Sequence, residues 1–203
     1  MRGITGTLLI ALLLSGCAAP PAEEASGTAA SQTENMRASM VESASRPILK
    51  EEILAAYEHA VRVYSWFDMT PLPTSEETRA EGGRLYRQVN MDGIDELEDL
   101  ETYLRSIFSQ ELADRLLEGE SARIRYREFD SALYVTGELR NRDPGKGAVR
   151  LETEQYDETT YFVNVLVELL AEDGETVVGM ESWSFPYALE DDRWVFTDFR
   201  LVY

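Results

Sequence analysis

The chain of 203 residues carries 38 acidic and 19 basic side chains, so its formal charge at pH 7 is -19. Nucleic acids and anionic lipid surfaces both attract clustered lysine and arginine, and the charge balance therefore argues against either as an electrostatic partner. With 44% hydrophobic and 10% aromatic residues, the chain can bury a sizeable core. One cysteine and one histidine cannot supply an intramolecular disulfide or a zinc site of the usual Cys/His kind. We therefore predict neither a metal ion nor a cofactor.

The first 17 residues, MRGITGTLLIALLLSGC, have the features of an export signal. Arg2 is followed by the apolar run Leu8–Leu14, which is too short to span a hydrocarbon core of ~30 Å. The tetrapeptide ending in Cys17 resembles the lipobox of bacterial lipoproteins. This resemblance implies cleavage before Cys17, a diacylglycerol on its sulfur, and anchoring at the extracytoplasmic face of the cell membrane. The alternative is an ordinary secretory signal or anchor in which Cys17 is incidental.

The next segment has the composition of a linker. Residues 18–46 are rich in alanine, serine, glutamate and threonine and contain almost no large apolar side chains. Such a segment cannot bury enough surface to offset its ordering entropy, so we expect a flexible tether. Pro47 suits the first turn of a helix and marks the expected domain start. The predicted parts are a lipoprotein signal peptide (1–16), a lipidated tether (17–46) and a single domain (47–203).

The first half of this domain has helical periodicity. Ile53, Tyr57, Val61 and Tyr64 recur at spacings of three and four, which predicts an amphipathic helix, and the prolines at 71 and 73 end it. Ser109 can cap a further helix that Gly119 would terminate. The expected elements are helices over 47–69, 95–108 and 110–118, a polar loop over 74–83 and a short strand over 84–90.

After Gly119 the period changes to two. Ala122, Ile124 and Tyr126 alternate with three arginines, which predicts a strand with one buried face. Further strands are expected over 133–135, 149–156, 159–170, 176–187 and 193–202, with a hairpin turn at Asp173-Gly174. The order favours an α+β domain, in which N-terminal helices pack on a C-terminal antiparallel meander sheet. Its topology resembles the cystatin-like and NTF2-like cone folds, a likeness that carries no function.

Two groups of side chains are candidates for a binding surface. Arg123, Arg125 and Arg127 would share one strand face, where they either pair with the surplus carboxylates or bind an anion such as a peptide carboxylate. Trp183 and Trp194 lie on the strands predicted over 176–187 and 193–202, where they either build the core or line a cleft. The sequence leaves both alternatives open.

No catalytic constellation stands out. His59 is expected to be solvated or half-exposed, off the apolar stripe of its helix, and no nucleophile elbow accompanies it. Carboxylate pairs such as Glu111 with Asp114 are expected by chance in so acidic a chain, and Asp198 is the remaining candidate for an enzymatic acid. The segment 88–99 resembles a calcium loop, but it lacks the first aspartate and the final glutamate, so we predict a turn at Asp92-Gly93.

A wider pattern over residues 50–203 consists of Ala56-Tyr57, Val63–Phe67, Pro71-Leu72-Pro73, Arg84–Val89, Gly93-Ile94, Leu100, Tyr103-Leu104, Phe108–Leu112 and Trp194–Phe199. This pattern resembles the secreted DL-endopeptidase inhibitor family of Gram-positive bacteria. The resemblance implies a non-enzymatic protein that binds and restrains a cell-wall peptidase, but it assigns no inhibitory residue. The alternatives are a lipoprotein that binds a small molecule or peptide in a cone-like cleft, and an enzyme with an Asp/Tyr pocket. The oligomeric state is not predicted.

Overall fold

The computed structural model describes residues 48–137 and 141–202, all of which belong to one unit, Ala44–Tyr203. Cys17, the tether and Pro47 lie outside the described residues. The described elements, in chain order, are α2 (Lys50–Ser65), β1 (Thr74–Glu81), β2 (Arg84–Val89), α3 (Leu97–Arg105), α4 (Gln110–Glu118), α5 (Glu120–Arg125), β3 (Tyr126–Phe129), β4 (Ala132–Thr136), β5 (Lys146–Gln155), β6 (Thr160–Leu170), β7 (Val177–Glu190) and β8 (Arg193–Phe196).

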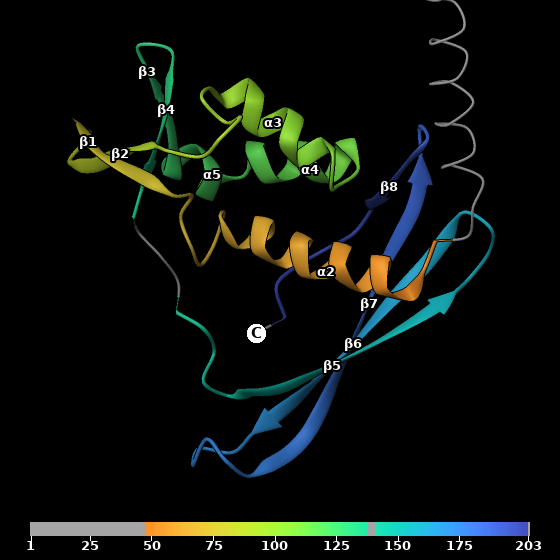
Figure 1. Ribbon diagram of the computed structural model, residues 1–203. Helices are drawn as coiled ribbons and strands as arrows, with labels where there is room; N and C mark the ends of the chain where they lie inside the picture. The colour runs from red at the N-terminus through yellow and green to blue at the C-terminus, as the bar shows by residue number, and fades with distance from the viewer. Residues whose placement is uncertain (1–47, 138–140, 203) are drawn as a thin grey trace, which may run out of the picture. The chain divides into compact units, whose positions relative to one another are not determined.

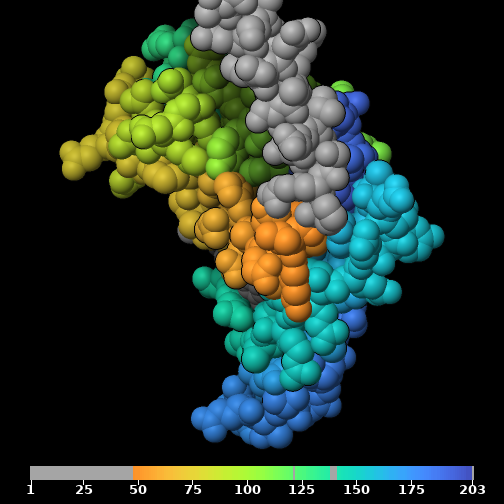
Figure 2. All heavy atoms as spheres, turned by 45° about the vertical axis from the view of Figure 1, so that its right-hand side comes forward, coloured from red at the N-terminus to blue at the C-terminus, as the bar shows by residue number. Residues whose placement is uncertain are grey.

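Two antiparallel sheets organise this domain. The first has the order β1-β2-β4-β3, and the second is the meander β5-β6-β7-β8. The second sheet curls, and α2 lies across one of its faces while α3 and α4 lie beyond the helix (Figure 1). In the space-filling view, the orange atoms of α2 lie between the green atoms of α3 and α4 and the cyan atoms of the second sheet (Figure 2). This arrangement confirms the predicted α+β class with helices on a C-terminal meander.

Alternation along the long strands determines the buried face of the meander. In β6, Tyr161, Val163, Val165 and Val167 are buried and alternate with partly exposed neighbours. The register places Val163 opposite Phe185, which also faces inward and is buried. Ile53, Tyr57, Ala60 and Val63 of α2 belong to the same core cluster. The predicted stripe is confirmed at Ile53 and Tyr57, whereas its members Val61 and Tyr64 are partly buried against the cluster.

Aromatic rings fill the centre of this core. The ring centroid of Phe199 lies 4.9 Å from that of Phe185, 5.1 Å from Phe196 and 5.6 Å from Tyr57. Phe199 belongs to the segment that follows β8, so the predicted strand over 193–202 is too long. The segment leaves the sheet after Phe196 because Phe199 and Val202 are buried in the core instead of extending the ladder.

The expected loop over 74–83 is wrong, since Thr74–Glu81 forms β1 and pairs with β2. This edge strand contains only exposed or partly exposed residues, so no apolar alternation marks it in the sequence. Its hairpin turn is Gly82-Gly83, with φ angles of +57° and +79°. Two consecutive glycines at positive φ are typical of a tight hairpin turn. The Gly-Gly pair is therefore the sequence feature that could have predicted the hairpin of β1 and β2.

The predicted strand through the three arginines, residues 122–127, is also wrong. Residues 120–125 form helix α5, and β3 begins only at Tyr126. Ala122 and Tyr126 are both buried, a spacing of four that fits a helix as well as the alternation of a strand. Ser109 caps α4 as expected by accepting a hydrogen bond from the Leu112 N–H, but Gly119 has a φ of -57° and is not left-handed.

Candidate functional site

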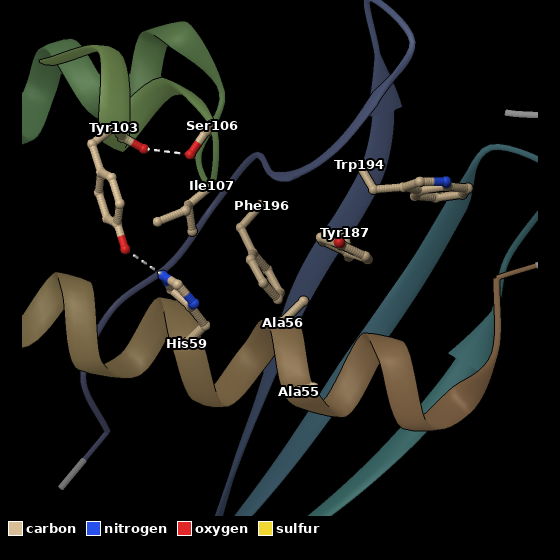
Figure 3. Close-up of a pocket in the computed structure, with 9 residues that line it drawn as sticks. All are labelled: Ala55, Ala56, His59, Tyr103, Ser106, Ile107, Tyr187, Trp194 and Phe196. Atoms are coloured by element: carbon tan, nitrogen blue, oxygen red, sulfur yellow. Dashed lines mark hydrogen bonds between the residues drawn. The ribbon is translucent and has the colours of Figure 1, made fainter. Parts of the chain in front are cut away.

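A cavity of about 410 Å³ opens between α2, the end of α3 and strands β7 and β8 (Figure 3). We call it the aromatic cleft. Its lining residues are Ala55, Ala56 and His59 from α2, Tyr103, Ser106 and Ile107 from the end of α3 and the turn after it, and Tyr187, Trp194 and Phe196 from β7 and β8.

The strand side of the cleft is built from stacked rings. Tyr187 and Trp194 lie side by side, with centroids 5.6 Å apart and planes at 29° (Figure 3). Trp194 also contacts Tyr161 at 5.5 Å, and Tyr187 contacts the fully buried Phe196 at 4.7 Å. Because each ring packs against another, the wall is held in shape before any ligand arrives.

The helix side of the cleft carries a polar pair. His59 Nε2 and the Tyr103 hydroxyl oxygen are 3.1 Å apart, and this hydrogen bond joins α2 to α3. Burial and the nearby Arg62 charge lower the pKa of His59 below its ordinary value of 6.5. Burial, with a contribution from the Glu52 carboxylate, raises the pKa of Tyr187 to about 12. Both groups are therefore neutral at pH 7, so the cleft has an uncharged lining that can still hydrogen bond.

His59 is the only histidine of the chain, so its titration is directly observable. We expect a midpoint below 6.5 for its imidazole in an NMR titration of a chain without a histidine tag. Since the unfolded state binds this proton at higher pH than the folded state, the free energy of unfolding should fall as the pH drops through about 6.5. The substitution His59→Gln should remove this component of the pH dependence, and a midpoint at or above 6.5 would contradict the assignment.

The structure does not bring the predicted binding residues together. Trp194 lines the aromatic cleft, but Trp183 lies elsewhere, with the Arg200 guanidinium 3.7 Å from its ring centroid. Close to Trp183, Lys146 forms an ion pair with Glu181 and holds the pKa of that carboxyl below its usual value. The two tryptophans therefore do not form one surface.

The three arginines also separate. Arg125 is buried, and one of its guanidinium N–H groups points at the Asp68 carbonyl oxygen, 3.5 Å away. Arg127 pairs with Glu81 at 3.2 Å, and Arg123 is exposed on α5. The three arginines therefore do not share one strand face, because Arg125 is buried, Arg127 is paired and Arg123 belongs to a helix. Of the two alternatives considered for these arginines, pairing with a carboxylate is found for Arg127.

The carboxylates considered as catalytic acids lie outside the aromatic cleft. Asp114 forms an ion pair with Arg105 at 3.0 Å, and the exposed Asp198 lines neither of the two cavities described for residues 48–137 and 141–202. Gly93 has a φ of +78°, as expected for a turn at Asp92-Gly93, and both residues line a polar cavity of about 310 Å³. Within the described ranges, no group of three or more metal-binding side chains gathers at one point.

Of the residues that line the cleft, only Trp194 was predicted from the sequence, and the polar pair His59 and Tyr103 was given no binding role. They are 44 positions apart, and only the packing of α2 against α3 brings them together. The sequence matches no family model, and no curated protein shows significant similarity to it. Among the described residues, no helix is long and apolar enough to cross a membrane.

Proposed function

We propose that this chain is a non-enzymatic, lipid-anchored binding protein of the cell envelope, and that the aromatic cleft is its binding site. The observation that supports the proposal is the cleft itself, which has about 410 Å³ of space between preformed aromatic walls. Pockets for small molecules and for anchoring side chains are typically concave, mostly apolar and supplied with a few oriented polar groups. The pair formed by His59 and Tyr103 is such a group.

The anchor and location in this proposal come from the sequence. The export signal with Cys17 at the expected end of its apolar run supports a lipid attachment that would keep the domain outside the cytoplasmic membrane. The ligand would then be a molecule of the envelope or the medium.

The binding proposal is tested by filling the cleft. Ala55 is exposed at its edge, so Ala55→Trp should place an indole in the space without disturbing the core. We expect the soluble chain (residues 17–203 with Cys17→Ser) to bind the neutral apolar dye Nile red, and Ala55→Trp to weaken that binding about tenfold.

The control is Ala148→Trp, which adds the same side chain at an exposed position of β5 outside the cleft. It should bind the dye as the parent chain does. The proposed site is wrong if the parent chain fails to bind the dye, or if the two tryptophan variants behave alike.

Restraint of a cell-wall DL-endopeptidase is the second candidate. Beside the sequence resemblance, it is supported by the exposed acidic turn that joins β6 to β7, where hydrogen bonds from Thr176 and Glu175 lower the pKa of Asp173 to about 2. This turn stays charged at any envelope pH and would speed association with a basic rim. The same soluble chain should slow digestion of peptidoglycan by a DL-endopeptidase, and an unchanged rate at saturating protein would exclude this function.

A further inference from the structure

We propose that the aromatic cleft selects a quaternary ammonium group, a cation wrapped in methyl groups. This inference rests on the proposed binding function and adds the chemical class of the ligand. Three properties of the cleft carry it: the aromatic lining, the state of its polar groups and the charges around it.

The lining favours a cation of low charge density. Four of its members, Tyr103, Tyr187, Trp194 and Phe196, present aromatic rings, and His59 adds a fifth ring. Aromatic faces attract cations through the ring quadrupole, most strongly for tryptophan and most effectively where water is excluded. The remaining lining residues are two alanines, an isoleucine and a serine, which contact methyl groups without competing for charge.

The hydrogen-bonding state of the cleft disfavours a primary ammonium ion. The polar groups of His59 and Tyr103 bond to each other, and the Ser106 hydroxyl donates to the Tyr103 carbonyl oxygen at 2.6 Å. A lysine-like ammonium brings three N–H donors, and the mostly apolar lining offers them only the remaining lone pairs of hydroxyl oxygens in place of the lost water. A quaternary ammonium has no N–H group and therefore avoids this cost.

The charges around the cleft favour a cation over an anion. The Glu52 carboxylate is close enough to Tyr187 to raise its pKa, and the turn Glu190-Asp191-Asp192 precedes Trp194 along the chain. Arg105 is paired with Glu101 and Asp114. Arg62, which lowers the pKa of His59, and Arg193, which donates to the Arg105 carbonyl oxygen and keeps its charge, oppose a cation. The chain as a whole carries a formal charge of -19, which draws cations toward it.

The test compares choline with 3,3-dimethyl-1-butanol, its neutral isostere, in which carbon replaces the nitrogen. Binding of each to the soluble Cys17→Ser chain is measured by calorimetry at low salt. We expect choline to bind at least tenfold more tightly than the neutral isostere, and tetramethylammonium to compete with choline.

Two variants locate the binding. Trp194→Leu should weaken choline binding at least tenfold, whereas Trp183→Leu, which changes a tryptophan outside the cleft, should leave it unchanged. Glu52→Gln keeps an N3 residue able to cap α2, and it should weaken the binding of choline but not of the isostere.

The outcomes separate the two proposals. Equal or tighter binding of the neutral isostere would overturn the selection of a cation while leaving an apolar binding site in place. Failure of both ligands, together with failure of Nile red, would overturn the binding function as well. Choline binding that survives Trp194→Leu at full strength would overturn the assignment to this cleft.

Discussion

Replacing Phe199 by alanine is expected to lower the free energy of unfolding by about 3–5 kcal/mol, the range for truncating a buried phenylalanine. The side chain is 3% exposed, and its ring contacts those of Tyr57, Tyr64, Phe108, Phe185 and Phe196. These partners come from α2, from the turn before α4 and from strands β7 and β8, so one truncation leaves a cavity that no single element can close. Urea denaturation followed by circular dichroism measures the loss.

The matched control for Phe199 is Tyr156→Ala. Tyr156 is 73% exposed, so its truncation should change stability by less than about 0.5 kcal/mol. If the two variants have the same urea midpoint, the Phe199 side chain does not stabilise the core as described.

The second large effect concerns the proposed anchor. Cys17→Ser should abolish incorporation of labelled palmitate and stop cleavage at the lipobox, because the thiolate that would accept the diacylglycerol is gone. Two acyl chains give stable membrane attachment, since each buried methylene contributes ~0.8 kcal/mol. We therefore expect the parent chain in the membrane fraction after a high-salt wash.

A separate variant distinguishes the lipid from the apolar signal. Combined with an ordinary secretory signal in place of residues 1–16, Cys17→Ser should appear in the soluble fraction. Persistence of this variant in washed membranes would show that something other than the acyl chains holds the protein there.

Much of the fold is predictable because its strongest patterns are long. The stripe on α2 and the strand over 159–170 extend over many residues, and both are predicted as the correct element; for α2 the stripe also places Ile53 and Tyr57 on the buried face. The errors fall on short or featureless segments. The six residues of α5 are too few to distinguish a helical period from the alternation of a strand. The side chains of β1 are nearly all exposed, so no apolar alternation marks this strand.

The site was less predictable than the fold. Trp194 could be proposed because large aromatic residues often line clefts, yet the same argument selected Trp183, which is covered by Arg200. His59 sits on a helix whose buried stripe passes beside it, and its role depends on Tyr103 approaching from another helix. Neither residue alone carries a local signal of this contact.

The position of Phe196, Phe199 and Val202 in the core has a consequence for biogenesis. These residues pack with Ile53 and Tyr57 of α2, which is synthesised well before them. Until residues 196–202 have been synthesised, α2 has an uncovered apolar face and this core cannot close. If the chain is exported as proposed, core closure would wait until residues 196–202 have crossed the membrane, and an open chain is what a secretion channel requires.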